Sequence, residues 1–579
     1  MRLLPAILIL LAALPAGAGT LTLQVRHLWD GEELRLPTGA TPTKAGETIS
    51  ITRLSYLLSQ PRLLRRGDSV RSGDWWSRDD WFAFVDASGG TPEPTLEEVP
   101  AGTYGSLRFT IGLDEQTDRA DPNRHAAGHP LNPLVNNLHW APQGGYIFLA
   151  LEGHLHANEP TGFAYHLGNA PNRMTVTVPL HLEMRGDSLV ILDFHLDRLF
   201  NRDPAFAVAP QASTHSRPGD PVATLLKERV EGAITLHAVR AAPTPAPPAP
   251  AGFAERPVVG TPYEFTVKRG FPIPALPTDY PLTEERVRLG GSLFYDMDLS
   301  KSNTLACASC HNPTYALTDG VPLATGDDGS VGTRNTMPLI NLAWKDKLLW
   351  DGRVDRIRDQ IVIPITHPRE MNESVENVIA EMEARPAYRR RFEEAFGSPG
   401  ITIERIGVAL EQFLLTKTSY DSRFDRAARG EGKERLTEQE KRGFELFMTE
   451  YDPRRGQLGA DCFHCHGGPF FTDHRFHDNG LYDAADLGLF TATGRDSDKG
   501  KFSTPSLRNV ALTAPYMHDG RFATLEEVVA HYNGPLDRRH NLDPNLAKHP
   551  AAGIQLPAAD QAALVAFLRT LTDPALEEE

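Results

Sequence analysis

The chain contains Cys307-Ala308-Ser309-Cys310-His311 and Cys462-Phe463-His464-Cys465-His466. Each stretch is a C-x-x-C-H run, in which two thiols about one helical turn apart can form thioethers to a porphyrin, and the next residue offers an imidazole to its iron. A zinc site or a disulfide pair is the alternative. Because the chain has only 4 cysteines and a histidine follows both pairs, the pattern predicts two covalently bound haem c groups.

Length and charge limit the classes of protein. A chain of 579 residues is too long for one hydrophobic core and predicts two to four domains. Its formal net charge is -16, and it has no long basic run. Such a surface repels nucleic acid and anionic membranes, so we expect neither as a partner.

The N-terminus has the pattern of a cleavable secretory signal over residues 1–18. Arg2 precedes an apolar run from Leu3 to Leu14, and Ala16-Gly17-Ala18 provides the small residues of a cleavage site. The run is too short to span a bilayer comfortably, which predicts no membrane span in the mature chain; a retained N-terminal anchor is the alternative. Haem c is attached outside the bacterial cytoplasm, so we expect a periplasmic protein.

Residues 19–240 are predicted to form an all-β, sandwich-like domain. Apolar residues alternate along 21–27, 107–111 and 174–182, with Gly, Pro, Asp and Asn between these runs. Residues 241–258 begin with Ala-Ala-Pro-Thr-Pro-Ala-Pro-Pro-Ala-Pro-Ala. This composition is typical of an extended linker, and it marks a domain boundary.

The sequence after the linker predicts helices. Ile403, Ile406, Leu410, Phe413 and Leu414 have the spacing of one buried helical stripe. Two Thr-x-x-Glu segments, 437–440 and 524–527, have capping-box spacing. We therefore expect two mainly α-helical haem domains, a peroxidatic domain at 259–430 and an electron-transfer domain at 431–579.

The segment from about Tyr263 to Asp573 resembles the di-haem cytochrome c peroxidase and MauG superfamily. The matching stretches are Leu349–Arg353 (LWDGR), His367–Met371 (HPREM), Thr504–Val510 (TPSLRNV), Ala514–Gly520 (APYMHDG) and Phe567–Thr572 (FLRTLT). The resemblance implies a hydrogen peroxide-dependent oxidoreductase. The branch of the superfamily to which the chain is similar depends on the residue that faces each haem iron from the side opposite its histidine.

At the rear haem, held by Cys462, Cys465 and His466, peroxidases of this family have a methionine ligand where this chain has Tyr532. Met517 is a nearby alternative thioether. The resemblance to MauG and its relative MbnH implies a His466/Tyr532 pair, and a phenolate favours the more oxidised states of iron. The tryptophan that MauG has just before its second C-x-x-C-H run is absent, because Gly459-Ala460-Asp461 precede Cys462.

At the front haem, held by Cys307, Cys310 and His311, peroxidases that need reductive activation have a distal histidine. Asp327 occupies that position, and no histidine occurs between His311 and His367. The resemblance therefore implies an open sixth position for peroxide. It also implies three distal residues: Gln360, Pro364 and Glu370, with Glu370 as the general base.

Between the haems the family has an electron-relay tryptophan and a calcium ion. These correspond to Trp350 and to a calcium site formed by the Asn335 side chain and the Thr513 and Pro515 carbonyls. For Trp350 the alternative is an ordinary core residue. Oxygen ligands suit calcium, but the assignment rests on the resemblance alone.

Residues 20–200 are similar to the periplasmic copper-binding MbnP and CorA family. The matching stretches are His27–Gly31 (HLWDG), Phe109–Asp114 (FTIGLD), His129–Leu131 (HPL), Trp140–Tyr146 (WAPQGGY) and Phe163–Gly168 (FAYHLG). The resemblance implies copper ligation by His27, His129 and His166. It also implies peroxide-driven oxidation of Trp140 to kynurenine. For each histidine an ordinary structural role is the alternative.

Together these features predict a fusion of a MauG/MbnH-like enzyme with its own protein substrate. Hydrogen peroxide would produce a high-valent state shared by the two haems, and this state would oxidise Trp140. One alternative is a cytochrome c peroxidase that reduces peroxide with electrons from a small redox protein and carries an accessory copper module. A second alternative is a copper carrier whose haems only pass electrons.

Overall fold

The computed structural model describes residues 18–68, 75–89, 93–140, 144–157, 161–217, 219–242, 259–431, 433–538 and 541–576. The predicted signal peptide, apart from Ala18, and all but the first two residues of the predicted linker lie outside them. The chain forms two compact units. The first comprises Met1–Asp118, Tyr146–Leu151 and Tyr165–Ala249, and the second comprises Arg119–Gly145, Glu152–Ala164 and Pro250–Glu579. None of the described helices has the length and apolar character needed to cross a bilayer.

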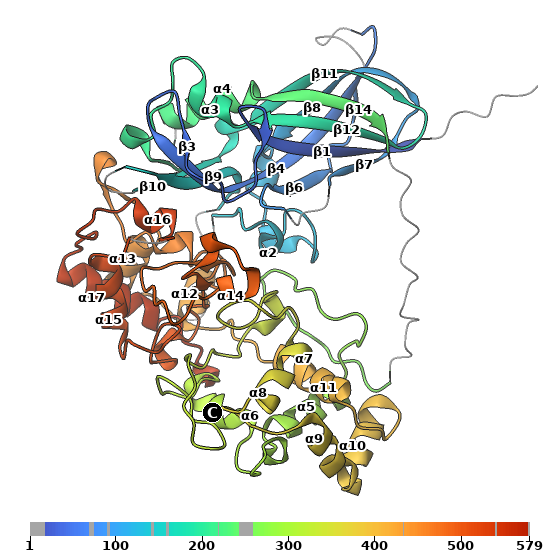
Figure 1. Cartoon of the computed structure of the whole chain (residues 1–579), viewed down its shortest axis with the longest axis vertical. Coiled ribbons are helices and arrows are strands. Elements are labelled where there is room, and N and C mark those ends of the chain that lie inside the picture. Colours follow the sequence, from blue (N-terminus) through green and yellow to red (C-terminus); the bar gives the residue numbers. More distant parts are fainter. Residues whose placement is uncertain are drawn as a thin grey trace, which may run out of the picture. The chain divides into compact units, whose positions relative to one another are not determined.

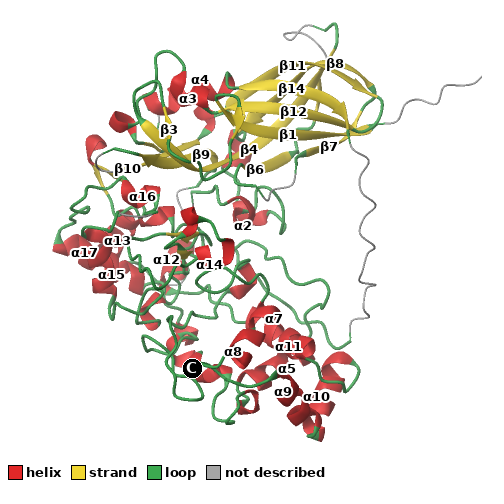
Figure 2. Cartoon of the chain, viewed as in Figure 1, coloured by secondary structure: helices red, strands yellow, loops and turns green. Residues whose placement is uncertain are grey.

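The N-terminal domain contains two sheets (Figures 1 and 2). In the smaller sheet β1 pairs in parallel with β12 and also carries β2 and β7. Its strands are β14 (Ile234–Ala241), β12 (Ser188–His195), β1 (Gly19–Trp29), β2 (Glu32–Glu33) and β7 (Thr95–Val99). Leu21 and Leu23 of β1 are fully buried, as the alternating pattern predicts.

The larger sheet is built around the 18-residue strand β4. Its main order is β11 (Met174–Met184), β8 (Gly102–Ile111), β4 (Thr48–Arg65), β9 (Ile147–Leu155), β10 (Thr161–Gly168) and β13 (Ser213–Thr214). Three short strands also pair with β4: β3 (Thr41–Pro42), β5 (Trp75–Ser77) and β6 (Phe82–Asp86). Buried and exposed residues alternate along the whole of β11.

The front haem domain is helical and has its own apolar core. Its main helices are α5 (Glu284–Phe294), α9 (Val375–Glu383), α10 (Pro386–Phe396) and α11 (Ile403–Leu415). Thr283 caps α5, where its side chain accepts from the Arg286 N–H. The stripe predicted from Ile403 to Leu414 lies on α11.

The rear haem domain has a second core. Its main helices are α12 (Arg423–Arg429), α13 (Glu438–Phe447), α15 (Leu525–Asn533) and α17 (Ala558–Arg569). Both predicted capping boxes are present, at the start of α13 and of α15. Phe424 of α12 packs on this rear core, so the change of core comes slightly before residue 430.

A glycine marks the same helix crossing in each haem domain. A Cβ on Gly290 of α5 would lie 1.9 Å from the Ala409 carbonyl of α11, and a Cβ on Gly443 of α13 would lie 1.9 Å from the Ala563 carbonyl of α17. The opposing atoms are backbone, which cannot rotate away as a side chain can. Glycine is therefore needed where α5 crosses α11 and where α13 crosses α17.

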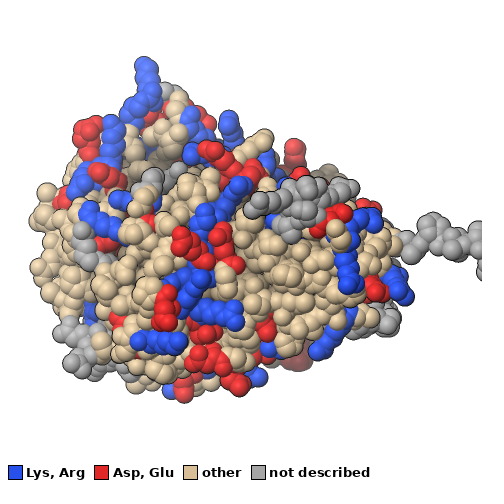
Figure 3. Space-filling view, turned by 90° about the horizontal axis from the view of Figure 1, so that it is seen from above, with Lys and Arg blue, Asp and Glu red and all other residues tan. Residues whose placement is uncertain are grey.

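The predicted fold class is confirmed: an all-β N-terminal domain precedes two mainly helical haem domains. On the face drawn in Figure 3, acidic and basic side chains are interspersed, without one large basic area. The formal net charge of the chain is -16.

Replacing Gly443 with valine is expected to destabilise the rear haem domain by about 1–3 kcal/mol or more, because the added side chain overpacks a backbone contact. Thermal unfolding followed by circular dichroism should show a melting temperature several degrees lower. Gly400→Ala is the control, because the nearest atom to a Cβ there is 3.8 Å away. An unchanged melting temperature for Gly443→Val would contradict the crossing described above.

Candidate haem centres and tryptophan segment

The front C-x-x-C-H run folds as a single helical turn. Cys307 and Cys310 begin and end α6 (Cys307–Cys310), and both are free thiols. The Nδ1–H of His311 donates to the Leu317 carbonyl at 2.9 Å. That bond leaves Nε2 as the only ring atom able to bind iron. Burial lowers the pKa of His311, which favours the neutral imidazole that a metal requires.

The rear run has the same geometry. Cys462 and His464 bound a 3-10 turn, and Cys465 is a free thiol as well. The Nδ1–H of His466 donates to the Phe471 carbonyl at 3.0 Å. Burial raises the pKa of Cys462 to about 12, so the thiol is protonated before thioether formation. Both runs therefore fit a covalently attached haem c.

Tyr532 lies near the rear run on α15. Its hydroxyl accepts a 3.2 Å hydrogen bond from Nδ2 of Asn479, and burial raises its pKa, with the thiols of Cys465 and Cys462 adding to the rise. The same amide donates to the Met517 sulfur at 3.5 Å. The structure thus brings both candidate donors together beside the haem attachment site. Asn479 is the residue that joins them.

The three predicted distal residues lie in or directly after two short helices. Gln360 ends α7 (Ile357–Gln360), Pro364 lies in α8 (Val362–Thr366), and Glu370 follows in a turn closed by its N–H to the His367 carbonyl. The Glu370 side chain is 47% exposed. Desolvation nevertheless raises its pKa, against the opposing charges of His367 and Arg353.

Asp327, the residue that the sequence predicts in place of a distal histidine, uses its carboxylate for a local contact. Its Oδ1 accepts from the Ser302 hydroxyl and, at 3.3 Å, from the Thr304 hydroxyl. Its own N–H donates to the Glu370 carbonyl at 2.7 Å. Asp327 therefore holds the loop that carries Glu370.

Trp350 is 8% exposed and is fixed at both its ring and its backbone. Its indole N–H donates to the Asn335 carbonyl at 2.9 Å, and its own carbonyl accepts from the Ser503 N–H at 2.9 Å. Trp350 thus connects the WDGR segment of the front domain with β18 (Phe502–Ser503) of the rear domain.

Asn335 has the right free atom for a cation ligand. Its side-chain amide donates to the carbonyls of Val321 at 3.0 Å and Pro322 at 3.2 Å. This orientation uses the amide nitrogen and turns Oδ1 the other way, which is the atom the predicted calcium site requires. Thr513 and Pro515 lie on either side of the cis Ala514-Pro515 bond.

The predicted copper ligands occupy separate surroundings. His27 of β1 bonds the Tyr56 hydroxyl at 2.9 Å, and burial lowers its pKa to about 4. His166 of β10 lies 3.2 Å from His215, measured from Nδ1 to Nε2. His129 accepts from the Leu131 N–H at 3.1 Å. Among the described residues, no group of three or more metal-donor side chains contains His27 or His129.

Trp140 is half-buried and lies in the part of the N-terminal sequence that belongs to the second unit. Its N–H donates to the Gly145 carbonyl at 3.0 Å, and its carbonyl accepts from the Gly144 N–H at 2.7 Å. Residues 141–143 lie outside the described residues. Trp140 therefore has a defined backbone position within the unit that holds both C-x-x-C-H runs.

Sequence reasoning missed two residues of these sites. Asn479 is 53 residues from Tyr532, and His215 is 49 residues from His166. Neither distance matches a helix or strand period, so no local pattern could have found them.

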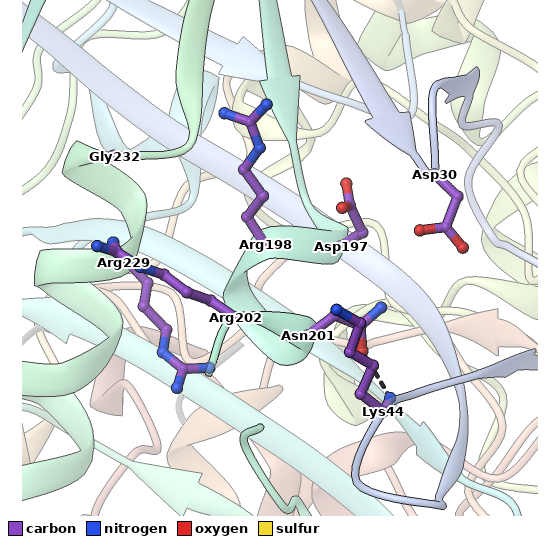
Figure 4. A pocket seen from close by; sticks show the side chains of 8 residues that line it. All are labelled: Asp30, Lys44, Asp197, Arg198, Asn201, Arg202, Arg229 and Gly232. Atoms are coloured by element: carbon purple, nitrogen blue, oxygen red, sulfur yellow. Dashed lines mark hydrogen bonds between the residues drawn. The ribbon is translucent and has the colours of Figure 1, made fainter. Parts of the chain in front are cut away.

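The first unit also has a pocket of about 500 Å³ (Figure 4). Its lining is Asp30, Lys44, Asp197, Arg198, Asn201, Arg202, Arg229 and Gly232. Arg229 uses its guanidinium to donate to the Leu199 and Pro204 carbonyls. No candidate copper histidine lines this pocket, so it is separate from the predicted metal chemistry.

The fold and the two centres define a c-type di-haem protein with a separate β domain. The model of the di-haem cytochrome c peroxidase family matches residues 284–433, and the MbnP family model matches residues 18–216. The methylamine utilization protein MauG of Methylophilus methylotrophus is 35% identical over 312 residues, which are 54% of this chain and 89% of the relative. MauG of Methylorubrum extorquens is 38% identical over 298 residues, 51% of this chain and 80% of the relative.

Two further relatives extend this comparison. Cytochrome c551 peroxidase of Nitrosomonas europaea is 33% identical over 310 residues, covering 52% of this chain and 84% of the relative. A solved MauG-like protein associated with microbial copper homeostasis is 36% identical and covers 54% of this chain and 97% of that one, with a TM-score of 0.48. The chain belongs to the di-haem cytochrome c peroxidase and MauG family, fused to an N-terminal MbnP domain. It is a peroxide-dependent di-haem oxidoreductase.

Replacing Tyr532 with methionine is expected to raise the reduction potential of the rear haem, because a thioether stabilises ferrous iron better than a phenolate does. A spectroelectrochemical titration of the holoenzyme measures the change. Met517→Leu removes the neighbouring sulfur and should leave the potential nearly unchanged. An unchanged potential in Tyr532→Met together with a changed potential in Met517→Leu would assign the iron ligand to Met517.

Proposed function

We propose that this enzyme uses hydrogen peroxide to oxidise Trp140 of its own MbnP domain to kynurenine, in the periplasm. The observation that carries the proposal is that residues 119–145, which include Trp140, belong to the same compact unit as the two haem-binding runs. The modified residue and the domain's histidines then serve copper binding, with His27, His129 and His166 as the candidate ligands. His215 is a further candidate because it contacts His166.

The overall reaction balances with two molecules of hydrogen peroxide. Tryptophan loses four electrons and gains two oxygen atoms to give N-formylkynurenine, while both peroxides are reduced to water. Hydrolysis then releases formate and leaves kynurenine. The bound haems supply the redox chemistry by accepting oxidising equivalents from peroxide and drawing electrons from the indole.

Glu370 is the proton carrier in this scheme. Its carboxylate takes a proton from incoming peroxide and returns it to the departing oxygen, so that water leaves. Gln360 and Pro364 shape the space above His311. The raised pKa of Glu370 brings its basicity closer to that needed for both proton transfers.

In this proposal Trp350 transfers electrons between the two haem sites, and the rear site stores part of the oxidising equivalents. Trp350 is held rigidly between Asn335 and Ser503, which suits an electron relay that must not reorganise. Tyr532 is proposed as the rear iron ligand, and calcium bound by Asn335, Thr513 and Pro515 would hold the same region. A phenolate at Tyr532 stabilises the oxidised rear haem while electrons leave Trp140.

A second candidate function is peroxide removal with electrons from a small redox protein and with the MbnP domain as an accessory copper module. The relative named cytochrome c551 peroxidase, at 33% identity, favours it. The two functions differ in the fate of Trp140.

Peptide mapping by mass spectrometry separates them. After peroxide treatment of the holoenzyme, the Trp140 peptide should gain the mass expected when an indole ring carbon is replaced by oxygen. The peptide with buried Trp29 serves as an internal control and should not change. Rapid peroxide turnover with a reduced cytochrome and an unmodified Trp140 would support the second candidate instead.

The reaction with peroxide should also depend on pH through Glu370. The carboxylate is the active base, and its pKa lies above the ordinary value of 4.5, so the rate should rise with pH through that pKa and then level off. Glu370→Gln should react with peroxide more slowly, by about a hundredfold or more. In stopped-flow measurements its rate should no longer rise with pH in this range. Glu376→Gln, at an exposed position of α9, should keep the wild-type profile.

A further inference from the structure

Three hydrogen bonds tie the Trp140 part of the second unit to backbone carbonyls of the rear haem domain. Nδ2 of Asn137 donates to the Asp473 carbonyl at 3.0 Å. Nε2–H of His154 donates to the Leu542 carbonyl at 2.7 Å, and the Thr161 hydroxyl donates to the Ala547 carbonyl at 3.2 Å. The donors come from residues 119–145 and 152–164, and the acceptors come from beyond residue 470.

Gly162 adds a steric fit to these bonds. A Cβ at this position would lie 1.8 Å from the Pro544 carbonyl, so only glycine allows the two backbones to approach this closely. Pro544 begins α16 (Pro544–Ala547), and Ala547 ends it. The Gly162 contact and the Thr161 bond therefore fall on the same short helix.

The accepting side is rigid and begins at a haem-attaching residue. The Asp473 N–H donates to the Cys465 carbonyl at 2.8 Å. The Asp473 carboxylate bonds Nε2 of His477 at 2.8 Å, and Nδ1 of His477 bonds the Asp543 carboxylate at 2.6 Å. Asp543 caps α16 by accepting from the Asn545 N–H. One network thus joins the Cys465 backbone to the acceptors at Asp473 and α16.

The donating side fixes Trp140 through Asn137. Asn137 follows α2 (Pro133–Asn136) in the left-handed conformation, and its N–H bonds the Pro133 carbonyl. The side-chain oxygen of Asn136 accepts from the Leu138 N–H at 2.7 Å. Trp140 comes only three residues after Asn137, and its backbone bonds Gly144 and Gly145. Asn137 therefore anchors the chain directly before Trp140.

We infer that Trp140 is oxidised within its own chain and that Asn137 is the positioning residue that holds the indole beside the rear haem. The inference rests on the proposed function. It adds the path that the electrons take and the statement that the reaction occurs within one chain. The Asn137–Asp473 and Asp473–Cys465 hydrogen bonds would give electrons from the indole a short path to a haem attached at Cys465. The reduction of two hydrogen peroxide molecules to water removes four electrons from Trp140.

A mixing experiment with full-length holoenzymes tests the molecularity. Heavy-nitrogen-labelled Glu370→Gln enzyme supplies an intact Trp140 with slow peroxide chemistry, and unlabelled Trp140→Phe enzyme supplies an intact Glu370 without the substrate residue. On peroxide addition, the heavy Trp140 peptide should be converted no faster than in the labelled enzyme alone. Conversion that rises in proportion to the added Trp140→Phe enzyme would overturn the inference.

Wild-type enzyme provides the matching positive measurement. Its rate constant for kynurenine formation should stay constant over a hundredfold dilution, whereas oxidation between chains would slow with dilution. Absence of kynurenine in wild-type enzyme at every peroxide concentration would instead refute the proposed function. The two failures are therefore distinguishable.

Asn137→Asp tests the positioning role. Aspartate tolerates the left-handed backbone but cannot donate to the Asp473 carbonyl, so kynurenine formation should slow by about tenfold, the effect of one lost hydrogen bond. The haem spectrum and peroxide turnover with a small reductant should not change. Asn123→Asp is the matched control, because the Asn123 amide bonds Asp121 within its own segment. Equal rates in both variants would remove Asn137 from the scheme.

Discussion

The chemistry of this protein depends on two hydrogen bonds from imidazole to backbone, His311 to Leu317 and His466 to Phe471. Each bond sets the tautomer and turns Nε2 toward the position of the iron. The accepting residues, Leu317 and Phe471, both have positive φ, of 62° and 52°. Such a conformation costs a non-glycine residue about 1–2 kcal/mol. Both side chains are buried in the domain cores, and this packing offsets the cost.

The surroundings of the rear haem contain an unusual density of buried charge. The Asp461 side chain is 1% exposed and contacts His464, Lys548 and His549. Burial favours the neutral acid, but the Lys548 charge and the contacts with the two histidines hold the pKa of Asp461 well below the ordinary value. Buried charges are tolerated only when they are paired and hydrogen-bonded. Asp461 directly precedes Cys462, so this ion network adjoins the rear haem attachment run. The inferred route through Asp473 lies on the other side of the C-x-x-C-H run in sequence.

Local patterns predicted much of the architecture. The alternating run from Met174 to Leu182 is β11, and the capping boxes at Thr437 and Thr524 begin α13 and α15. Such signals act over a few residues, where backbone geometry alone sets the period. The crossing at Gly443 was not predicted, because a glycine in a helical pattern does not reveal which backbone approaches it.

For the functional site, the sequence by itself determined the two haem attachment runs, because the thiol and imidazole ligands are adjacent in the chain. Only the tertiary structure placed Asn479 beside Tyr532 and Met517, brought His215 to His166, and joined Asn137 to Asp473 across 336 residues of sequence. These contacts depend on how separate elements pack, and packing is a property of the whole folded chain that no local period encodes.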